Sequence, residues 1–358
     1  PFLILATPLA AQSDSNQIVV TGTPIEDSAR ALADCLARGC SPEEDITLTL
    51  AHAENQFVAG EYKDGDQTLN KSISRNKKHK AEVPELLAGL YRASARFSEH
   101  LGEPSDFKFA TLNMRDTLRD VFGEDDRRVL IAQTEVGDSR AKLGSLRDAQ
   151  SIYTAVEQRA LELNYPRVAS FARLRQALLQ QVKWSDGKQS SRALMNYKAA
   201  LTQLITEPLP NSDDFSLVAQ VLQARLLREL EKPEATDQLI ATFLAKGGTE
   251  KPILLYNEPF ESITESLFSE NSRFRDRRSN TLARLTTPQL NRPRYIDIGF
   301  WIRPDGTTAE VEILREQGTN DWHGSVLAQI ASRRYAPLKL DATSPGLFHI
   351  ERYTQTAR

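Results

Sequence analysis

Apolar and polar residues alternate most regularly near the C-terminal end of the chain. Within 295–303 the apolar positions of one face are Ile296, Ile298, Phe300 and Ile302. This period of two predicts a strand with that face on a core and the opposite face in water. Pro304–Gly306 has the residues of a tight turn, because proline presets φ and glycine accepts the positive φ that closes a hairpin. A return strand is predicted from Ala309, Val311 and Ile313.

After Gly318 the period changes to that of a helix. One stripe of a short helix is formed by Trp322, Val326, Leu327, Ile330 and Ala331. We expect this helix to end at Tyr335-Ala336-Pro337 and a third strand to cover 346–353. Residues 294–358 are therefore predicted to form a small β-β-α-β domain.

The middle of the chain, 45–248, is predicted to be helical with a recurring spacing of small and large residues. The clearest frame comprises Val136, Gly137, Gly144, Leu146, Ala149, Tyr153 and Val156. The same frame fits Ala53, Gly60, Tyr62, Gly65, Leu69 and Ser72. Weaker copies cover 168–204 and 216–245. The pattern resembles tetratricopeptide repeats, whose stacked helical hairpins bury their apolar faces on one another. Such arrays imply a protein or peptide partner on the concave side; the alternative is a helical scaffold without a ligand.

The predicted C-terminal domain is similar to that of TonB energy transducers. The likeness rests on the strand, the Pro-Asp-Gly turn, the second strand and a helix closing on Arg333-Arg334-Tyr335-Ala336-Pro337. It implies an α+β fold in the cell envelope and a partner that adds a strand to the sheet. Large or basic residues typical of interfaces are the candidate contacts: Trp301, Arg303, Arg333, Arg334 and Tyr335. The alternative for Tyr335 is that it packs the helix onto the sheet.

The N-terminal residues indicate export. Residues 1–12 resemble the end of a secretory signal peptide, with an apolar run followed by small residues; the alternative is a buried N-terminal strand. In the segment that follows, 13–44, the candidate partner-binding residues Ile18, Val19, Val20 and Thr21 form a β-prone stretch similar to the start of TonB-dependent receptors. We expect it to pair with a sheet edge; the alternative is a disordered terminus. The expected location is the periplasm.

Cys35 and Cys40 are the only cysteines, and both lie at a predicted helix junction. Gly39 is expected to stop the first helix, and Ser41-Pro42-Glu43-Glu44 has the residues of a capped helix start. A disulfide between the two cysteines fits an oxidising compartment. Metal binding would need further ligands, and His52 is the one histidine nearby. A basic run, 71–80, is interpreted as a solvated helix end or, alternatively, a surface that binds acidic groups.

Composition narrows the function. The chain has 358 residues and a formal net charge of −3, which argues against nucleic-acid binding through counterion release. Hydrolase, zinc-helix and phosphate-loop motifs are missing from the sequence. The sequence therefore predicts a non-enzymatic periplasmic adaptor without a cofactor, metal or small-molecule substrate. Its partners would be envelope proteins, either an outer-membrane receptor or a TonB-like system that links it to TonB-dependent transport, and it would contact the membrane only peripherally or through a partner. The alternative is a structural subunit of an envelope complex.

The segment 249–293, between the helical region and the C-terminal domain, is predicted to be a linker because it is interrupted by proline and glycine residues.

Overall fold

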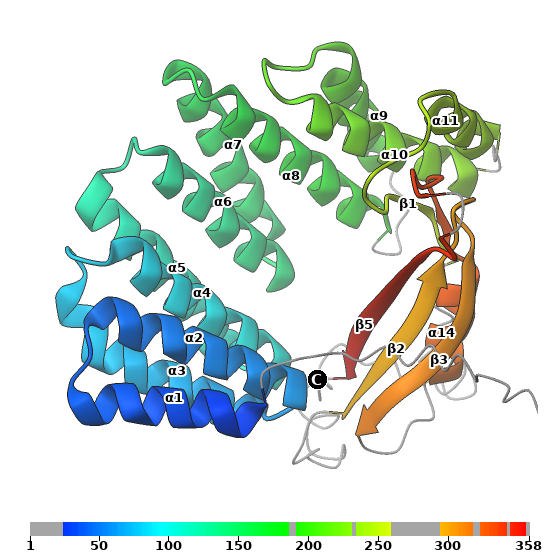
Figure 1. Cartoon of the computed structure of the whole chain (residues 1–358). Helices are drawn as coiled ribbons and strands as arrows, with labels where there is room; N and C mark the ends of the chain where they lie inside the picture. Colours follow the sequence, from blue (N-terminus) through cyan, green and yellow to red (C-terminus); the bar gives the residue numbers. More distant parts are fainter. Residues whose placement is uncertain are drawn as a thin grey trace, which may run out of the picture.

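A curved array of helical hairpins and a small antiparallel sheet make up the protein (Figure 1). The computed structural model describes residues 24–185, 191–230, 234–258, 294–317, 323–341 and 344–355. The sheet lies across the open side of the arc and extends from its last helices back to its first ones (Figure 1). The helices are α1 (Ile25–Arg38), α2 (Pro42–Ala59), α3 (Tyr62–Asn76), the 3-10 turn η1 (Lys77–His79), α4 (Pro84–Leu101), α5 (Pro104–Phe122), α6 (Arg127–Lys142), α7 (Leu146–Glu162), α8 (Pro166–Ser185), α9 (Ser191–Thr206), α10 (Asp213–Glu229) and α11 (Glu234–Ala245).

Small residues allow neighbouring helices to approach closely, as the sequence predicted. A Cβ atom added to Gly137 of α6 would lie 2.4 Å from the Tyr153 ring of α7, and one added to Gly65 of α3 would lie 2.2 Å from the Phe97 ring of α4. Gly144 takes φ 80° between α6 and α7, a value that glycine adopts without strain. The predicted hairpin array is therefore confirmed, and it includes the α4–α5 pair, which no predicted repeat frame covered.

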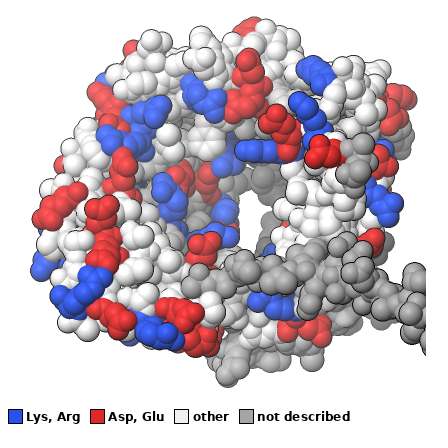
Figure 2. Space-filling view, in the orientation of Figure 1, with Lys and Arg blue, Asp and Glu red and all other residues white. Residues whose placement is uncertain are grey.

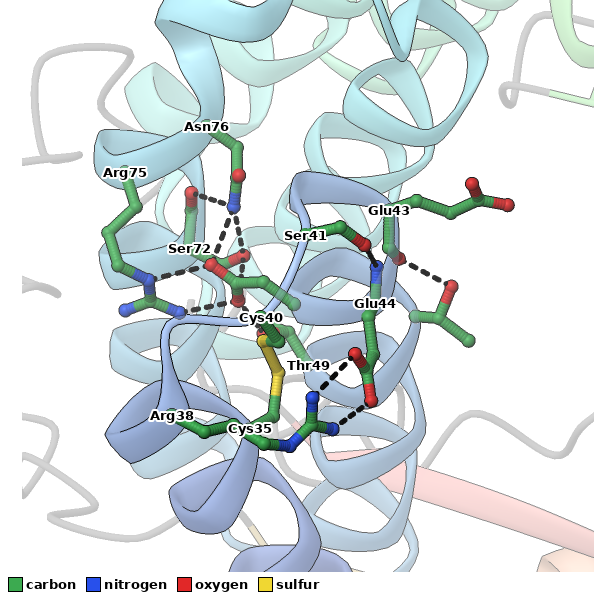
Figure 3. Close-up of a disulfide and its surroundings, with 12 residues drawn as sticks. Cys35, Arg38, Cys40, Ser41, Glu43, Glu44, Thr49, Ser72, Arg75 and Asn76 are labelled. Carbon is green, nitrogen blue, oxygen red and sulfur yellow. Dashed lines mark hydrogen bonds and ion pairs between the residues drawn. A yellow bond between two sulfur atoms is a disulfide. The ribbon is translucent and has the colours of Figure 1, made fainter.

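The first two helices are joined by the predicted disulfide (Figure 3). Gly39 ends α1 in the left-handed conformation, and Ser41 accepts a hydrogen bond from the backbone N–H of Glu44 at the start of α2. Cys35 and Cys40, with Cα atoms 5.1 Å apart, are bonded across this turn. Arg38 forms an ion pair with Glu44 beside the disulfide. The expected cap and cysteine bridge are thus confirmed.

Polar groups also hold α2 against α3. The carboxylate of Asp45 is buried and accepts hydrogen bonds from Thr49, Ser72, Arg75 and Asn76 (Figure 3). Arg75 belongs to the basic run 71–80, which was interpreted as solvated. This member of the run instead stabilises the contact between α2 and α3. Four partners satisfy a carboxylate that burial would otherwise penalise.

The main sheet has three strands in the order β3-β2-β5: β2 (Arg294–Ile302), β3 (Thr308–Gln317) and β5 (Leu347–Gln355). Gly306, with φ 83°, donates to the Arg303 carbonyl at 2.8 Å and closes the β2–β3 turn as predicted. Helix α14 (His323–Ala331) covers one face of the sheet. The core between them is formed by Ile296, Ile298, Phe300, Ile302, Val326, Ile330, Tyr335 and Leu338.

Two details of this region differ from the prediction. Helix α14 ends at Ala331, earlier than expected, and Arg334–Tyr335 form a short strand, β4, between α14 and β5. The first part of the opposite face of β2, which was expected to be wet, is buried: Tyr295 is 7% exposed and Asp297 is 2% exposed. The reason is that the end of α2 covers this face, and α2 lies too far away in the sequence for a local pattern to reveal it.

The other end of the sheet region is anchored to the last helices by an apolar core. Strand β1 (Leu254–Tyr256) pairs with β4, although it belongs to the segment expected to be a linker. Arg225 of α10 donates a hydrogen bond to the Leu255 carbonyl at 3.1 Å. The shared core consists of Val221, Ala224, Leu239, Phe243, Leu255 and Ala336.

Several sequence predictions fall outside the described residues. They include the signal-peptide-like residues 1–12, the β-prone stretch 18–21, most of the expected linker and Trp322. Within the described part of the chain, no helix combines the length and apolar character needed to cross a bilayer.

Candidate functional site

The sheet meets the first hairpin through one arginine. Arg352 of β5 donates hydrogen bonds to the backbone carbonyls of Phe57 and Val58 in the last turn of α2. The Phe57 carbonyl also accepts the backbone N–H of Gly60. Both carbonyls lie at the negative end of the helix dipole, so a guanidinium is well suited to bind them. Arg352 therefore binds the C-terminal end of α2 from the sheet.

The same guanidinium is held in place by the buried carboxylate of Asp297 on the neighbouring strand β2. Arg352 donates from Nε to Asp297 Oδ1 at 2.6 Å and from Nη2 to Asp297 Oδ2 at 2.7 Å. Arg315 of β3 also pairs with Asp297, at 2.9 Å, but its side chain is half exposed. Burial alone would lower the pKa of Arg352, but the hydrogen bonds to Asp297, together with its charge and the nearby Tyr62 hydroxyl, outweigh burial and raise it, so the group stays charged. We call Arg352, Asp297 and the end of α2 the junction.

Gly60 completes the junction by making room for an aromatic ring. Tyr295 lies so close that a Cβ atom on Gly60 would come within 2.4 Å of its Cε1 atom. The Tyr295 hydroxyl donates to the Ala59 carbonyl at 3.4 Å, and the Arg352 guanidinium lies 4.0 Å from the centre of the same ring. The end of α2 thus contacts both β2 and β5.

A cavity of about 570 Å³ opens beside the junction. Its walls come from both parts of the protein: the inner sides of α2 and α4, and strands β2, β3 and β5. The helices contribute mainly apolar groups, with Leu50, Ala53, Phe57, Val58, Ala93 and Phe97 among them, and the charged residues Glu54, Arg92 and Arg96. The sheet contributes Asp297, Arg315, Ile350 and Arg352.

An aromatic cluster supports the helical wall of the cavity. The Phe57 ring makes edge contacts with Tyr62, Phe97 and His100, with ring centres 5.0, 5.3 and 4.7 Å away. Burial lowers the pKa of His100 below its usual value, so the imidazole is neutral at pH 7. The guanidinium of Arg96 lies 4.7 Å from the centre of the Phe57 ring, on the cavity side.

Charged pairs continue along the inner helices. Three ion pairs join α4 to α6 with the same offset in sequence: Glu85–Arg128 at 2.5 Å, Arg92–Glu135 at 2.8 Å and Glu99–Lys142 at 2.6 Å. The α4 members are two turns apart, so the pairs form a ladder that sets the register between adjacent hairpins. Figure 2 shows basic and acidic side chains together around the hollow between the arc and the sheet. Because these pairs are largely exposed, each one stabilises the fold only weakly.

The predicted contact residues do not form one surface. Arg303 is exposed in the β2–β3 turn, and Trp301 is half-buried with its ring centre 5.3 Å from that of Phe348. Arg334 is half-buried in β4. Residues 18–21 lie outside the described residues. Of the predicted contact residues that the structure describes, only Arg303 is freely accessible.

Arg333 and Tyr335 were expected beside the wet face but are buried. Arg333 donates to both carboxylate oxygens of Glu351, at 2.7 and 2.9 Å, and to the hydroxyls of Tyr335 and Tyr353. Burial alone would raise the pKa of Glu351, but hydrogen bonds from His349, Arg333 and Tyr353 hold it far below its usual range. This network fixes β5 to the segment after α14, so Arg333 and Tyr335 serve the fold in this structure.

The residues that do converge were not predicted from the sequence. Asp297 lies between apolar residues of a strand, which is a signal that its face has a charged partner. The basic residue of β5, Arg352, and the α4 arginines gave no comparable signal, because charged residues at such positions are usually solvated.

Comparisons with known proteins identify no family. No protein-family model matches the sequence, and no curated protein matches it. Among solved structures, BtubC from P. vanneervenii is 15% identical with a TM-score of 0.45, over 63% of this chain and 92% of that chain. A Podosopora anserina protein described as a kinesin light chain with nearly identical TPR-like repeats is 12% identical with a TM-score of 0.41, over 51% of this chain and 87% of that chain.

These similarities concern the helical array at most, and at such TM-scores no functional argument rests on them. They do not support the likeness of 294–358 to the TonB C-terminal domain. The class defined by the structure itself is a tetratricopeptide-like helical array bridged by a small sheet.

Proposed function

We propose that this protein is a non-enzymatic scaffold that binds a protein partner on the inner side of its helical array. The observation that carries the proposal is the junction: the sheet closes onto α2, so that α2, α4 and the sheet surround one cavity. A groove enclosed on two sides buries more of an extended ligand than an open helical surface does.

The energetics of the array favour an interaction role. Each hairpin stabilises its neighbours by burying apolar residues, and the inner helices are left with arginines and carboxylates in partly apolar surroundings. Arginine and aromatic residues are common at the centres of protein interfaces. That the protein has no enzymatic activity is proposed from the sequence motifs alone.

The compartment and the partner are finer parts of the proposal. The Cys35–Cys40 bridge and the signal-peptide-like residues 1–12 support an oxidising compartment, which we propose to be the periplasm. A partner from a TonB-linked envelope system, bound by strand addition, is supported only by the sequence likeness of 294–358. The alternative is a structural subunit, which would sediment as a permanent complex with its neighbours.

Photo-crosslinking tests the scaffold function. Benzoylphenylalanine replaces Glu135, beside the cavity-lining Arg92, or as control Met195, which is 66% exposed on α9. Each full-length variant is irradiated in extract of the producing cells, and adducts are identified by mass spectrometry. We expect position 135 to form an adduct with a protein partner, and an excess of this protein without the crosslinker should suppress that adduct. The partner, once purified, should bind this protein directly. Adducts from position 195 alone would overturn the proposal.

A further inference from the structure

The cavity beside the junction has features of a ligand site that the fold does not need. We infer that it binds an extended segment of a partner protein that presents a large apolar side chain next to a carboxylate. This inference rests on the proposed function and deepens it by giving the site and the chemistry of its ligand. Three independent observations carry it: a glycine without a packing role, an arginine without a carboxylate, and walls shared between the helices and the sheet.

Gly89 leaves space in the helical wall. It lies within α4 and lines the cavity, where glycine destabilises a helix by roughly 1 kcal/mol relative to alanine. Gly65 and Gly137 are explained by aromatic rings packed against them, whereas a Cβ on Gly89 would meet only the Leu50 Cδ1 atom, at 3.8 Å. Gly89 also has no positive φ. Gly89 therefore has no packing role between helices, whereas a long side chain at this position would occupy part of the cavity that the residue lines.

The apolar part of the cavity determines one half of the ligand. Its helical wall contains Leu50, Ala53, Phe57, Ala93 and Phe97. The volume of about 570 Å³ lies in the range of roughly 300–1,000 Å³ typical of ligand sites. A leucine- or phenylalanine-sized side chain would lose its hydration here and contact these groups.

The charges determine the other half. Four arginines line the cavity, and they face the lining carboxylates Glu54 and Asp297 and the adjacent Glu135. Arg92 is paired with Glu135, while Arg315 and Arg352 share Asp297. Among the described residues Arg96 has no carboxylate within 4 Å and only covers the Phe57 ring. A ligand carboxylate beside the apolar side chain would give Arg96 its ion pair.

The shared walls couple the ligand to the junction. Because α2 and α4 form one side and β2, β3 and β5 the other, the site is complete only when the sheet is closed onto α2. A ligand that binds only the closed form must stabilise it by its binding free energy. Binding of the partner segment and closure of the junction are therefore linked.

Fluorescence anisotropy with full-length protein tests the site. The probes are fluorescein-labelled peptides of equal length in a Gly/Ser background, with the cores Asp-Leu-Glu, Lys-Leu-Lys and Asp-Ser-Glu. We expect the Asp-Leu-Glu peptide to bind about tenfold more tightly than either control, an order expected for one charge-assisted contact or one apolar anchor. Equal binding of the Lys-Leu-Lys peptide, or no binding of the Asp-Leu-Glu peptide, would overturn the inference.

Variants of two residues localise the binding. Gly89→Met fills the cavity and should weaken binding at least about tenfold, whereas Gly89→Ala leaves the space open and should change it less than about twofold. Arg96→Gln should weaken the acidic peptide alone and serves as the second variant if Gly89→Met does not fold by circular dichroism. If the peptide and the partner crosslinked from position 135 both bind Gly89→Met normally, the scaffold function stands and the cavity inference fails.

Discussion

The ion pair between Arg352 and Asp297 connects the sheet to the first helices of the array. Their side chains form a bidentate ion pair within β5 and β2, and the same guanidinium binds the last carbonyls of α2. At the opposite end, the sheet region is held by an apolar core with α10 and α11. One end is thus fixed by buried apolar area and the other by a few directional hydrogen bonds, so the structure should open at the junction first.

Arg352→Ala should loosen this junction. Because Arg315 still pairs with Asp297, we expect the free energy of unfolding to fall by only about 2 kcal/mol, the contribution of hydrogen bonds to a charged group. Spin labels at Lys63 and Glu312, one on each side of the junction, should show a longer and broader distance distribution.

Two controls accompany this experiment. Arg315→Ala removes a charge from Asp297 but leaves the α2 carbonyls bound, and it should cost less than about 1 kcal/mol because the side chain is half exposed. Labels at Gln238 and Lys339, at the apolar end, should give the same distances in all variants. An unchanged distribution across the junction in Arg352→Ala would contradict the proposed opening. The two native cysteines are bonded to each other, so only introduced thiols react.

A second prediction compares two glycines with the same backbone conformation. Gly60 and Gly144 both have φ 80°, but a Cβ on Gly60 meets the Tyr295 ring, whereas one on Gly144 meets nothing within 4 Å. Gly144→Ala should cost about 1–2 kcal/mol from backbone strain, and Gly60→Ala should cost about 1–3 kcal/mol more from overpacking. Urea unfolding gives both values, and equal losses would show that Tyr295 does not press on this position.

The sequence predicted features that depend on nearby residues. The Pro304–Gly306 turn, the helix cap at Ser41, the disulfide and the hairpins with Gly137 and Gly65 all follow from local chemistry or from one helix packing on the next. Each of these signals is complete within a short stretch, so no knowledge of the distant chain is needed.

The candidate site depended on contacts between distant segments. The alternation of apolar and polar residues placed Asp297 on the face of β2 opposite to that of Ile296. It could not show that α2 covers the face that carries Asp297. Strand β1 is only three residues long, too short for a periodic signal, and its partner β4 was assigned to a helix end. The open space at Gly89 depends on how α2, α4 and the sheet pack together. The residues next to Gly89 in the sequence are those of an ordinary helix and do not indicate it.

Removal of the disulfide should destabilise the first helix. The bridge closes a loop between residues five apart in sequence, for which chain entropy predicts about 2 kcal/mol. We expect Cys35→Ala/Cys40→Ala to lose about that much stability in urea and to exchange the amides of α1 faster, while α8 is unaffected. Reduced wild-type protein should match the variant, and the variant should not respond to reductant. Wild-type stability in the variant would contradict a structural role for the bridge.

The pH dependence of stability should reveal one half-buried carboxyl group. Burial, with the nearby Glu103 and Asp106 carboxylates, raises the pKa of Asp66 from 3.8 to about 6. The folded state therefore binds more protons than the unfolded state between these values, and this contribution to stability is lost as pH rises through about 6. Asp66→Asn removes the penalty while its amide oxygen can still accept the hydrogen bond from Asn70. We expect the variant to be more stable at pH 8 by on the order of 2 kcal/mol and equal to wild type below pH ~4, as measured by urea unfolding across pH. Asp64→Asn, on the exposed side of α3, is the matched control and should leave the dependence of stability on pH unchanged. If the stability of Asp66→Asn runs parallel to that of wild type across pH, Asp66 keeps an ordinary pKa.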